Sequence, residues 1–450
     1  MYRRVPKDLT EATTLGAFMS VCALVMMAVL FTAESMAFFS SGIVTEIGLD
    51  ENMDQKLELH FNITLLDLEC DLVSVDVWDM LGTNLQNVTK NVEKWQTDSF
   101  GNRKLFSGRN RKIRELAHDD HGDVTLEDLH QDGVHAIPLQ KDNFHDFLKQ
   151  HEVVFVDFFA PWCIWCQRLL PTWERLAEVV QEKHMPVQIV SVDCVTQADL
   201  CREQRILAFP TLRVYEHGVP QVPDYRQDRT VEALSGFIHR KLELNSKFKD
   251  WEKTQSKAEV DEFRKLKNNP EMANPGCQVS GSLFVNRVPG NFHVHASSVN
   301  HNINPAMTNL THVVNHLSFG SLPSQLSRSQ RRYVQPNLPA LEPLNGITFP
   351  TSAYHQAYHH AIKVVSTNFY DKSITMYQFL EQSQLVYFSE TDVPQAVFSY
   401  DLSPMSIIVK EDSRHWYDYL THLFAIIGGT FTSLGLIDAT LYKVFKPKKL

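Results

Sequence analysis

The 450-residue sequence lacks an excess of positive charge: 53 acidic residues outweigh 43 lysines and arginines, for a formal net charge of −10. Binding to a phosphate backbone needs a basic surface, and the sequence has no basic stripe, so a nucleic-acid partner is disfavoured. Cysteines are few, seven in all. One Cys-x-x-Cys pair is present, but the other close pair, Cys194 and Cys201, has six residues between its members, which argues against a four-ligand zinc site.

Eight of the 20 histidines fall between residues 293 and 360, without a recurring ligand spacing. They are His293, His295, His301, His312, His316, His355, His359 and His360. This arrangement favours solvated or hydrogen-bonded histidines over metal ligands, and we predict neither a metal nor a cofactor. The alternative is a pH-sensitive interface that releases a bound protein in a more acidic compartment.

The most informative motif is V-V-F-V-D-F-F-A-P-W-C-I-W-C, from Val153 to Cys166. Residues 153–159 are apolar apart from Asp157, which predicts a strand covered on both faces and a buried carboxyl. Apolar residues recur at helical spacing after Pro161, so Cys163 is expected in the first turn of a helix, where unpaired N–H groups lower a thiol pKa. Cys166, one turn further on, is suited to resolve a mixed disulfide. Thiol–disulfide exchange is the favoured interpretation, with a structural or metal role as the alternative.

Phe209-Pro210-Thr211 begins a second apolar strand, Leu212–Tyr215. With this element, residues 134–244 resemble a thioredoxin-fold domain of the protein disulfide isomerase group. The resemblance implies that Cys163 is the nucleophile, Cys166 the resolving thiol and Pro210 a cis proline beside them. It also implies that Asp157 exchanges a proton with Cys166, and that Arg229 swings toward the site to stabilise the second thiolate. The alternatives are a merely structural acid and a solvated arginine.

The sequence departs from that group between the two cysteines. Isomerases usually carry Gly-His there, whereas this chain carries Ile164 and Trp165. Without an imidazole in the motif, we predict a Cys163 pKa above that of a Gly-His domain and a less oxidising disulfide. The two bulky side chains either form an apolar surface that binds unfolded substrate or simply pack against the fold.

Two long apolar segments lie near the ends of the chain, Leu15–Thr32 and Tyr419–Ile437. Each is long enough to cross a membrane. The alternatives are a cleaved signal peptide for the first and a buried core helix for the second. Basic residues flank both segments on their outer sides, which predicts cytosolic termini and a luminal middle. The basic residues are Arg3, Arg4, Lys7, Lys443, Lys446, Lys448 and Lys449.

Short signals agree with a secretory-pathway location. Sequons at Asn62, Asn87 and Asn309 all lie in the predicted luminal region. The terminal K-P-K-K-L resembles the K-x-K-x-x signal by which coat proteins return membrane proteins to the endoplasmic reticulum; the alternative is an ordinary basic flank. We therefore expect an endoplasmic reticulum membrane protein that cycles to the ER–Golgi intermediate compartment.

The remaining sequence predicts a mainly β domain, with alternating strands such as Leu57–Leu65 and Gln278–Val288. Three of its motifs resemble the luminal domain of two-span cargo receptors of ER–Golgi vesicles: L-V-S-V-D-V-W-D-M-L-G from Leu72, V-N-R-V-P-G-N-F-H from Val285 and N-H-L-S-F-G from Asn315. The A-I-I-G-G-T-F-T segment from Ala425 matches too. The combination resembles membrane-bound protein disulfide isomerases of the plant and protist type, some of which replace the second cysteine with serine. This chain keeps both.

The predicted fold class is an α/β thioredoxin fold inserted in a mainly β luminal domain, with two transmembrane helices. The expected order is a cytosolic N-terminus (1–14), a transmembrane helix (15–38), the first half of the β domain (39–101), a charged, exposed connector (102–132), the thioredoxin-like domain (133–245), a linker or solvated helix (246–274), the second half of the β domain (275–416), a transmembrane helix (417–438) and a cytosolic tail (439–450).

Cysteine parity then suggests three disulfides: Cys163 with Cys166, Cys194 with Cys201, and Cys70 with Cys277 across the two halves of the β domain. For Cys194 and Cys201 the alternative is two free buried thiols. Cys22 stays unpaired in the membrane. The predicted function is thiol–disulfide oxidoreductase and isomerase activity on secretory-pathway client proteins. The alternative is a vesicle cargo receptor whose insert mainly binds cargo. Expected partners also include vesicle coat proteins, through the cytosolic tails, and a second copy of the chain or a related receptor.

Overall fold

The structure, a computed structural model, describes residues 14–39, 42–50, 55–86, 88, 90–98, 101–109, 114–120, 135–254, 259, 276–321, 325–334, 342–370, 373–412 and 415–445. Its backbone contacts divide the chain into two units. Unit 1 comprises residues 1–49, 367–375 and 405–450, and unit 2 comprises residues 50–366 and 376–404.

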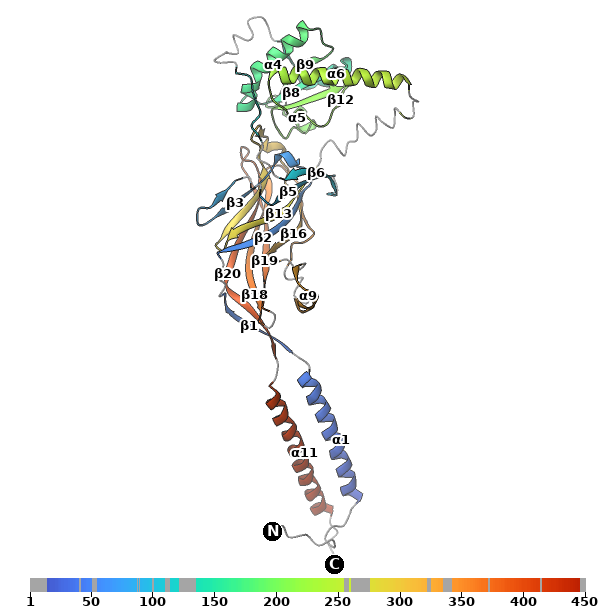
Figure 1. Ribbon diagram of the computed structural model, residues 1–450, viewed down its shortest axis with the longest axis vertical. Helices are drawn as coiled ribbons and strands as arrows, with labels where there is room; N and C mark the ends of the chain where they lie inside the picture. The colour runs from blue at the N-terminus through green and yellow to red at the C-terminus, as the bar shows by residue number, and fades with distance from the viewer. Residues whose placement is uncertain are drawn as a thin grey trace, which may run out of the picture. The chain divides into compact units, whose positions relative to one another are not determined.

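Unit 1 contains two long apolar helices, α1 (Thr14–Phe39) and α11 (Trp416–Phe445), which run side by side in Figure 1. Their segments Ala17–Phe39 and Trp416–Ile437 are long and apolar enough to cross a membrane, with mean hydropathies of 2.0 and 1.6. The ring of Tyr419 stacks on Phe38 at 4.4 Å between centroids, and its hydroxyl lies 2.8 Å from Ser35 Oγ. Strand β1 (Gly42–Leu49) pairs antiparallel with residues 405–412, so the segments next to the two helices are joined.

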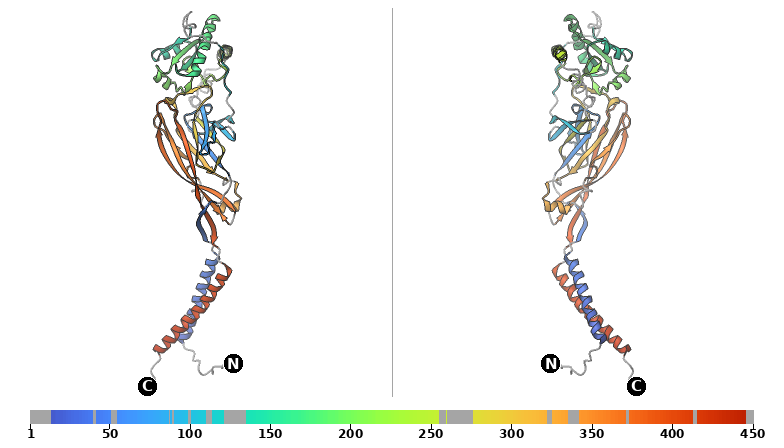
Figure 2. Two further views of the ribbon diagram at one scale, coloured as in Figure 1. Left: turned by 90° about the vertical axis from the view of Figure 1, so that its left-hand side faces the viewer. Right: turned by 90° about the vertical axis from the view of Figure 1, so that its right-hand side faces the viewer.

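The β part of unit 2 consists of two sheets packed face to face (Figure 2). One sheet has the order β19 (Ile374–Tyr387), β18 (Gln356–Phe369), β20 (Gln395–Asp412), β14 (Gly290–Ala296), β3 (Val73–Asp79) and β4 (Asn84–Leu85). The other has the order β17 (Ile347–Phe349), β16 (His312–Phe319), β2 (Lys56–Leu65), β13 (Gly276–Asn286), β5 (Val92–Thr97) and β6 (Arg103–Arg109). Short helices η2 (Cys70–Leu72), η3 (Pro305–Met307) and α9 (Arg328–Val334) lie between strands.

Each sheet contains strands from both halves of the β domain. Strand β13, from the second half, lies between β2 and β5 of the first, and β14 pairs with β3. Inward-facing apolar side chains from both sheets form one core, in which Phe61, Phe292 and Phe398 are essentially inaccessible. Because each half supplies strands to both sheets, neither can bury its apolar face without the other.

The inserted domain has a five-stranded sheet in the order β12 (Val219–Pro220), β11 (Thr211–Glu216), β8 (Val153–Phe159), β9 (Gln188–Asp193) and β7 (Ile137–Pro138). Alternate side chains of β8 pack on opposite faces. Val154 and Val156 belong to an apolar cluster with side chains of α3 (Lys141–Gln150) and α5 (Ala198–Glu203), whereas Val153 and Phe155 belong to a second cluster with side chains of α4 (Ile164–Glu182) and α6 (Val231–Thr254). The predicted strand covered on both faces is confirmed, and so is the predicted fold class.

One segment differs from the prediction. The stretch 102–132, expected to be an exposed connector, contributes β6 to the edge of a sheet, where arginine and lysine side chains remain in solvent. Its residues 114–120 pack on the inserted domain. The stretch 246–274, predicted as a solvated helix or linker, begins as helix, because α6 continues to Thr254 with ion pairs one turn apart such as Glu243–Lys247.

Candidate active site

The two motif cysteines lie where β8 gives way to α4. Cys163 is the N-cap of α4, and its Sγ accepts a hydrogen bond from the Cys166 backbone N–H at 3.1 Å. The pair is joined by a disulfide. Cys163 is 0% exposed and Cys166 is 5% exposed. When the disulfide is reduced, the same N–H group and the helix N-terminus favour a thiolate on Cys163.

Large apolar side chains surround the cysteines. Trp162 and Ile164, on either side of Cys163, are both about half exposed, at 53% and 51%. Trp165 is half-buried, and the Arg168 guanidinium lies 5.0 Å from its ring centroid. The Trp162 ring also contacts Phe209 edge to face at 5.8 Å. The site thus combines a covered disulfide with an exposed apolar rim.

Asp157 lies in the middle of the inserted sheet, opposite Leu212 of β11 and Ser191 of β9. Its side chain is buried, and Oδ1 has no hydrogen-bond partner. Burial raises the pKa of Asp157 to about 7, while the positive charge of Arg229 acts in the opposite direction. A carboxyl with this pKa can take up or release a proton near neutral pH.

Arg229 is 2% exposed, in contrast with the solvated-surface alternative. Its Nη1 has no hydrogen-bond partner. Burial lowers the pKa of Arg229 to about 10, whereas the Asp157 charge acts to raise it, so the guanidinium remains charged at neutral pH. The fold therefore brings together the buried acid and the arginine that the sequence analysis identified.

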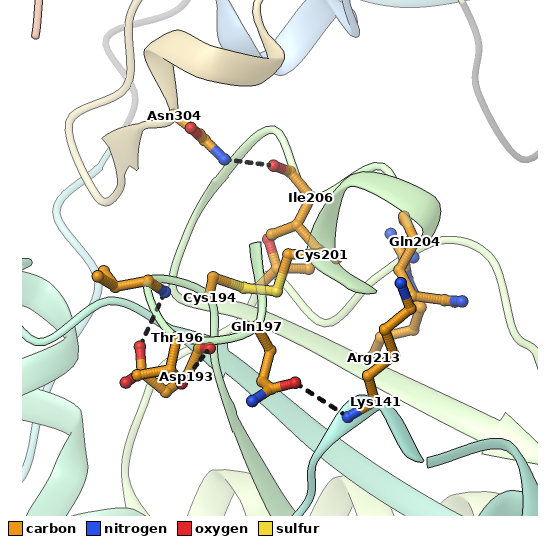
Figure 3. The surroundings of a disulfide bond; sticks show 12 residues. Lys141, Asp193, Cys194, Thr196, Gln197, Cys201, Gln204, Ile206, Arg213 and Asn304 are labelled. Atoms are coloured by element: carbon orange, nitrogen blue, oxygen red, sulfur yellow. Dashed lines mark hydrogen bonds between the residues drawn. A yellow bond between two sulfur atoms is a disulfide. The ribbon is translucent and has the colours of Figure 1, made fainter. Parts of the chain in front are cut away.

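Pro210 follows a cis peptide bond after Phe209. The two residues before it, β10 (Ala208–Phe209), pair antiparallel with β15 (Asn302–Ile303) from the second half of the β domain. Asn304 extends the contact: its backbone N–H donates to Leu207 O at 2.9 Å. Its Nδ2 donates to Ile206 O at 3.2 Å (Figure 3). The backbone edge next to Pro210 is thus occupied by the chain's own β15.

The structure joins the same cysteines that the parity argument paired. Cys194 and Cys201 link the end of β9 to α5, with Cα atoms 5.6 Å apart (Figure 3). Between them, Gln197 Oε1 accepts from the Lys141 backbone N–H at 3.0 Å. Cys70 and Cys277 are both buried and bridge η2 to β13, with Cα atoms 4.8 Å apart. Cys22 is free.

Two of the three sequon asparagines lie in the described part of the chain. Asn62 Oδ1 accepts from Gln278 Nε2 at 2.7 Å, and Asn309 Oδ1 accepts from Thr351 Oγ1 at 2.6 Å. Asn87 lies outside the described residues, as do Arg3, Arg4, Lys7 and the terminal K-P-K-K-L. Glycosylation and the coat-protein signal remain predictions.

Two histidines of the β domain, His312 and His360, are part of its core. His312 and His360 are fully buried, with their Nε2 atoms 3.1 Å apart, and His360 Nδ1 lies 2.6 Å from Ser383 Oγ. Burial lowers the pKa of His312 to about 4 and that of His360 to about 3, so both rings are neutral. Among the described residues, no three His, Cys, Asp or Glu side chains are placed to share a metal ion.

One residue at the site, His118, is not predicted from the sequence. The ring of His118 lies 5.9 Å from that of Trp165, nearly parallel at 24°, and its backbone forms a bridge with Arg229. The motif itself carries no imidazole, but the fold brings one to it from a segment 45 residues upstream of Cys163. His118 lies in a charged stretch without periodicity, so no pattern in the sequence marked it.

Three family models match successive parts of the chain. Residues 1–86 match the Endoplasmic Reticulum-Golgi Intermediate Compartment (ERGIC) family, residues 135–240 match thioredoxin, and residues 240–438 match the endoplasmic reticulum vesicle transporter family. The thioredoxin domain is therefore inserted between the two parts of a vesicle-transporter protein.

Relatives with the same full-length arrangement are known from plants. Protein disulfide-isomerase 5-4 of Arabidopsis thaliana is 32% identical over 98% of this chain and 94% of its own length. The chain belongs to this family of protein disulfide isomerases. Protein disulfide isomerase-like 5-4 of Oryza sativa is 29% identical over 99% of this chain and 95% of its length. A crystal structure of Erv41p covers 82% of this chain and 99% of its own, at 13% identity and a TM-score of 0.36.

Membership confirms several predictions made from the sequence. This protein disulfide isomerase is a thiol–disulfide oxidoreductase of the ER–Golgi membranes, with a thioredoxin domain inside a β domain of the vesicle-transporter type. The family does not by itself assign roles to Ile164, Trp165 or His118.

Proposed function

We propose that Cys163 and Cys166 are the redox pair through which this protein exchanges disulfides with secretory-pathway proteins. The observation that carries the proposal is the position of Cys163 at the N-cap of α4, with the Cys166 N–H directed at its sulfur at 3.1 Å. A thiolate formed there is stabilised by backbone donors, which compensates in part for the missing imidazole of the motif.

The exchange proceeds in two steps. In the reducing direction, the Cys163 thiolate attacks a client disulfide, forms a mixed disulfide and displaces one client thiolate. Cys166 then loses its proton, attacks Cys163 Sγ and releases the second client thiolate, leaving the Cys163–Cys166 disulfide. The oxidising direction is the reverse. Asp157 takes the proton from Cys166 in the second step, and the Arg229 charge favours the ionised Cys166 sulfur.

Asp157→Asn tests the proton-transfer step. We expect the rate of mixed-disulfide resolution to fall on the order of 100-fold, because Asn cannot accept a proton. The pH dependence of this rate near pH 7 should disappear with it. Quenched-flow sampling of the mixed disulfide between pH 5 and 9 measures both effects. An unchanged pH profile in the variant would assign the proton transfer to another group.

The same substitution has a predictable effect on stability. Burial raises the pKa of Asp157 above its ordinary value of 3.8, to about 7, so folding favours the protonated acid. This contribution is fully present below pH 3.8 and is lost as pH rises through about 7. Asp157→Asn should therefore gain stability relative to the unsubstituted protein as the pH rises through that window.

The location and partners form part of the proposal. Both ends of the chain lie in the cytosol, where the terminal lysines bind vesicle coat proteins, and the region between α1 and α11 is luminal. The substrates are client proteins of the early secretory pathway, and the chain associates with a second copy or a related receptor. Support comes from the two apolar helices and from the ERGIC and vesicle-transporter family matches.

The direct test uses the full-length protein in lipid nanodiscs. Insulin reduction and refolding of scrambled ribonuclease are measured beside a Cys163→Ser/Cys166→Ser double variant. Activity that is lost in the double variant supports the redox assignment. Equal activity in both proteins, with both folded, contradicts it.

A second candidate function is cargo binding by the β domain. A groove of about 840 Å³ crosses the outer face of the sheet that contains β3, β14, β18 and β20. Trp78, Met80 and Leu380 line it and are 46%, 77% and 74% exposed. An open apolar groove of this kind can hold a cargo protein. Transport that survives loss of both cysteines but fails when Trp78 is replaced by Ala would favour this function.

A further inference from the structure

The segment Arg114–Asp120, hereafter the strap, is held on the inserted domain by its backbone. The Arg229 N–H donates to Ala117 O at 2.7 Å, and His118 and Arg229 form a parallel bridge. The Val231 N–H, at the start of α6, donates to Asp119 Oδ2 at 2.7 Å. A carboxylate at a helix N-terminus satisfies a free donor and complements the helix dipole. The strap therefore pairs with the stretch that carries Arg229.

The other side of the strap is tied to the β domain, in the same unit of the structure. Asn300, 3% exposed, accepts from the Leu116 N–H at 2.9 Å through Oδ1 and donates to Arg114 O at 3.0 Å through Nδ2. On the inserted domain, Asp228 adds a bond from the Ala117 N–H to its Oδ1 at 3.0 Å. A segment with partners on both sides keeps a defined position, unlike a solvated connector.

Side chains of the strap contact the redox helix. The His118 ring lies over Trp165, and Glu115 pairs with Arg168 at 3.8 Å. Arg168 in turn contacts the Trp165 ring. The strap therefore touches both the residue next to Cys166 and the stretch that carries Arg229.

Polar atoms without partners gather around Arg229. Both ring nitrogens of His118 are buried without a hydrogen bond, as are Asp157 Oδ1 and Arg229 Nη1. Unpaired buried polar atoms cost free energy, and a group of them at one place calls for an explanation, of which a catalytic role is one. The Arg229 charge acts on both Asp157 and His118, so it links these two side chains electrostatically.

We propose that the strap is a working part of the redox site, in which His118 is a positioning residue that holds Arg229 beside Asp157. The inference rests on the roles proposed above for Asp157 and Arg229. The ring contact with Trp165 anchors the strap to α4, and the strap backbone fixes Arg229. Arg229 is thereby kept inside the site throughout the cycle, and the protonation of Asp157 depends on how firmly it is held.

The charges around Asp157 and His118 determine in which direction the titration of Asp157 should shift. Within the described residues, Arg229 is the charged group whose field acts on Asp157. His118 is faced by Arg229, Arg168, Glu115 and Asp119. A positive charge close to a carboxyl favours its ionised form, so an Arg229 that is held less firmly makes Asp157 protonate at higher pH.

The test follows the Asp157 carboxyl by infrared difference spectroscopy in the reduced full-length protein in nanodiscs. The band is identified by its loss in Asp157→Asn. In His118→Ala we expect the titration midpoint to rise by about 0.5–1 pH unit. His118→Phe keeps an aromatic ring over Trp165 and should titrate like the unsubstituted protein. His239→Ala, an exposed histidine on α6, is the matched control and should cause no shift.

A double-mutant cycle separates positioning from a general structural effect. In an Arg229→Gln background, His118→Ala should cause no further shift, since the charge it positions is gone. The proposal is overturned if His118→Ala leaves the midpoint unchanged, or if the shift is as large without Arg229. If His118→Ala fails to fold, Asp119→Ala is used instead, since it removes the bond between the strap and the N-terminus of α6. The proposal is then overturned if Asp119→Ala leaves the Asp157 midpoint unchanged, or if its shift is as large without Arg229.

This readout does not require exchange activity. If the unsubstituted protein fails to reduce insulin, the redox function fails, while the titration still reports whether the strap positions Arg229. If the protein is active, the pH midpoint of mixed-disulfide resolution should shift upward in His118→Ala in parallel with the carboxyl titration. Activity with no shift in either midpoint retains the function and rejects the role of His118.

Discussion

Cys163→Ser is expected to abolish disulfide exchange, with insulin reduction reduced to the rate seen without enzyme. The first bond to a client disulfide is made by the Cys163 sulfur, and a serine hydroxyl at the same N-cap is not ionised at neutral pH and forms no disulfide. In this assignment Cys166 does not replace it, because Cys166 lies one helical turn further from the N-terminus of α4. The assay is performed on the full-length protein in nanodiscs with a thiol reductant.

Cys166→Ser should behave differently from Cys163→Ser. The first step remains possible, but the mixed disulfide cannot be resolved within the protein, so covalent complexes with client proteins should accumulate on non-reducing gels. Cys22→Ser is the matched control, since Cys22 is the free cysteine of the apolar helix α1. Trapped complexes with Cys163→Ser in place of Cys166→Ser would reverse the assignment of nucleophile and resolving thiol.

Removal of the Cys70–Cys277 disulfide is expected to destabilise the β domain more than any other single cross-link. The two cysteines are 207 residues apart in sequence. In the chain-entropy model, closing a loop of this length contributes about 5 kcal/mol. The expected loss in Cys70→Ala/Cys277→Ala is of that order, and urea unfolding followed by pulse proteolysis of the β domain measures it. The loop also contains the whole inserted domain, which this disulfide encloses.

The Cys194–Cys201 disulfide provides the matched comparison. It closes a loop of only seven residues in sequence separation, for which the same model gives about 2–3 kcal/mol. Cys194→Ala/Cys201→Ala should therefore be less destabilising by about half. Equal losses for the two double variants would mean that local packing, and not loop closure, determines the contribution of each disulfide.

Much of the inserted domain could be predicted from sequence because its signals are local. The apolar run of β8 with its single acid, followed by cysteines and helical periodicity, defines a strand, a turn and a helix within 30 residues. Cysteine parity predicts the Cys70–Cys277 pair, because these two cysteines remain once the two close pairs and the membrane-segment Cys22 are set aside. Both predicted spans are continuous apolar runs, whose length alone indicates that they can cross a membrane.

Long-range contacts could not be predicted in this way. The charged stretch after β6 has no apolar periodicity, which predicts an exposed connector, whereas in the structure its backbone pairs with Arg229 and the ring of His118 contacts Trp165. These contacts are made by backbone groups and by an isolated ring, neither of which leaves a pattern in sequence. The same is true of β15, which occupies the edge before Pro210 through two residues.

The sequence by itself determined the chemistry of this protein: two cysteines one helical turn apart after a buried strand, an acid within that strand and apolar segments at both ends. Periodicity and residue type decide these features, and both are local. Only the tertiary structure decided the environment of that chemistry. Burial raises the Asp157 pKa, and chain segments 35 or more residues from the motif supply Arg229, His118 and β15. Their positions depend on packing between distant segments, which no local pattern encodes.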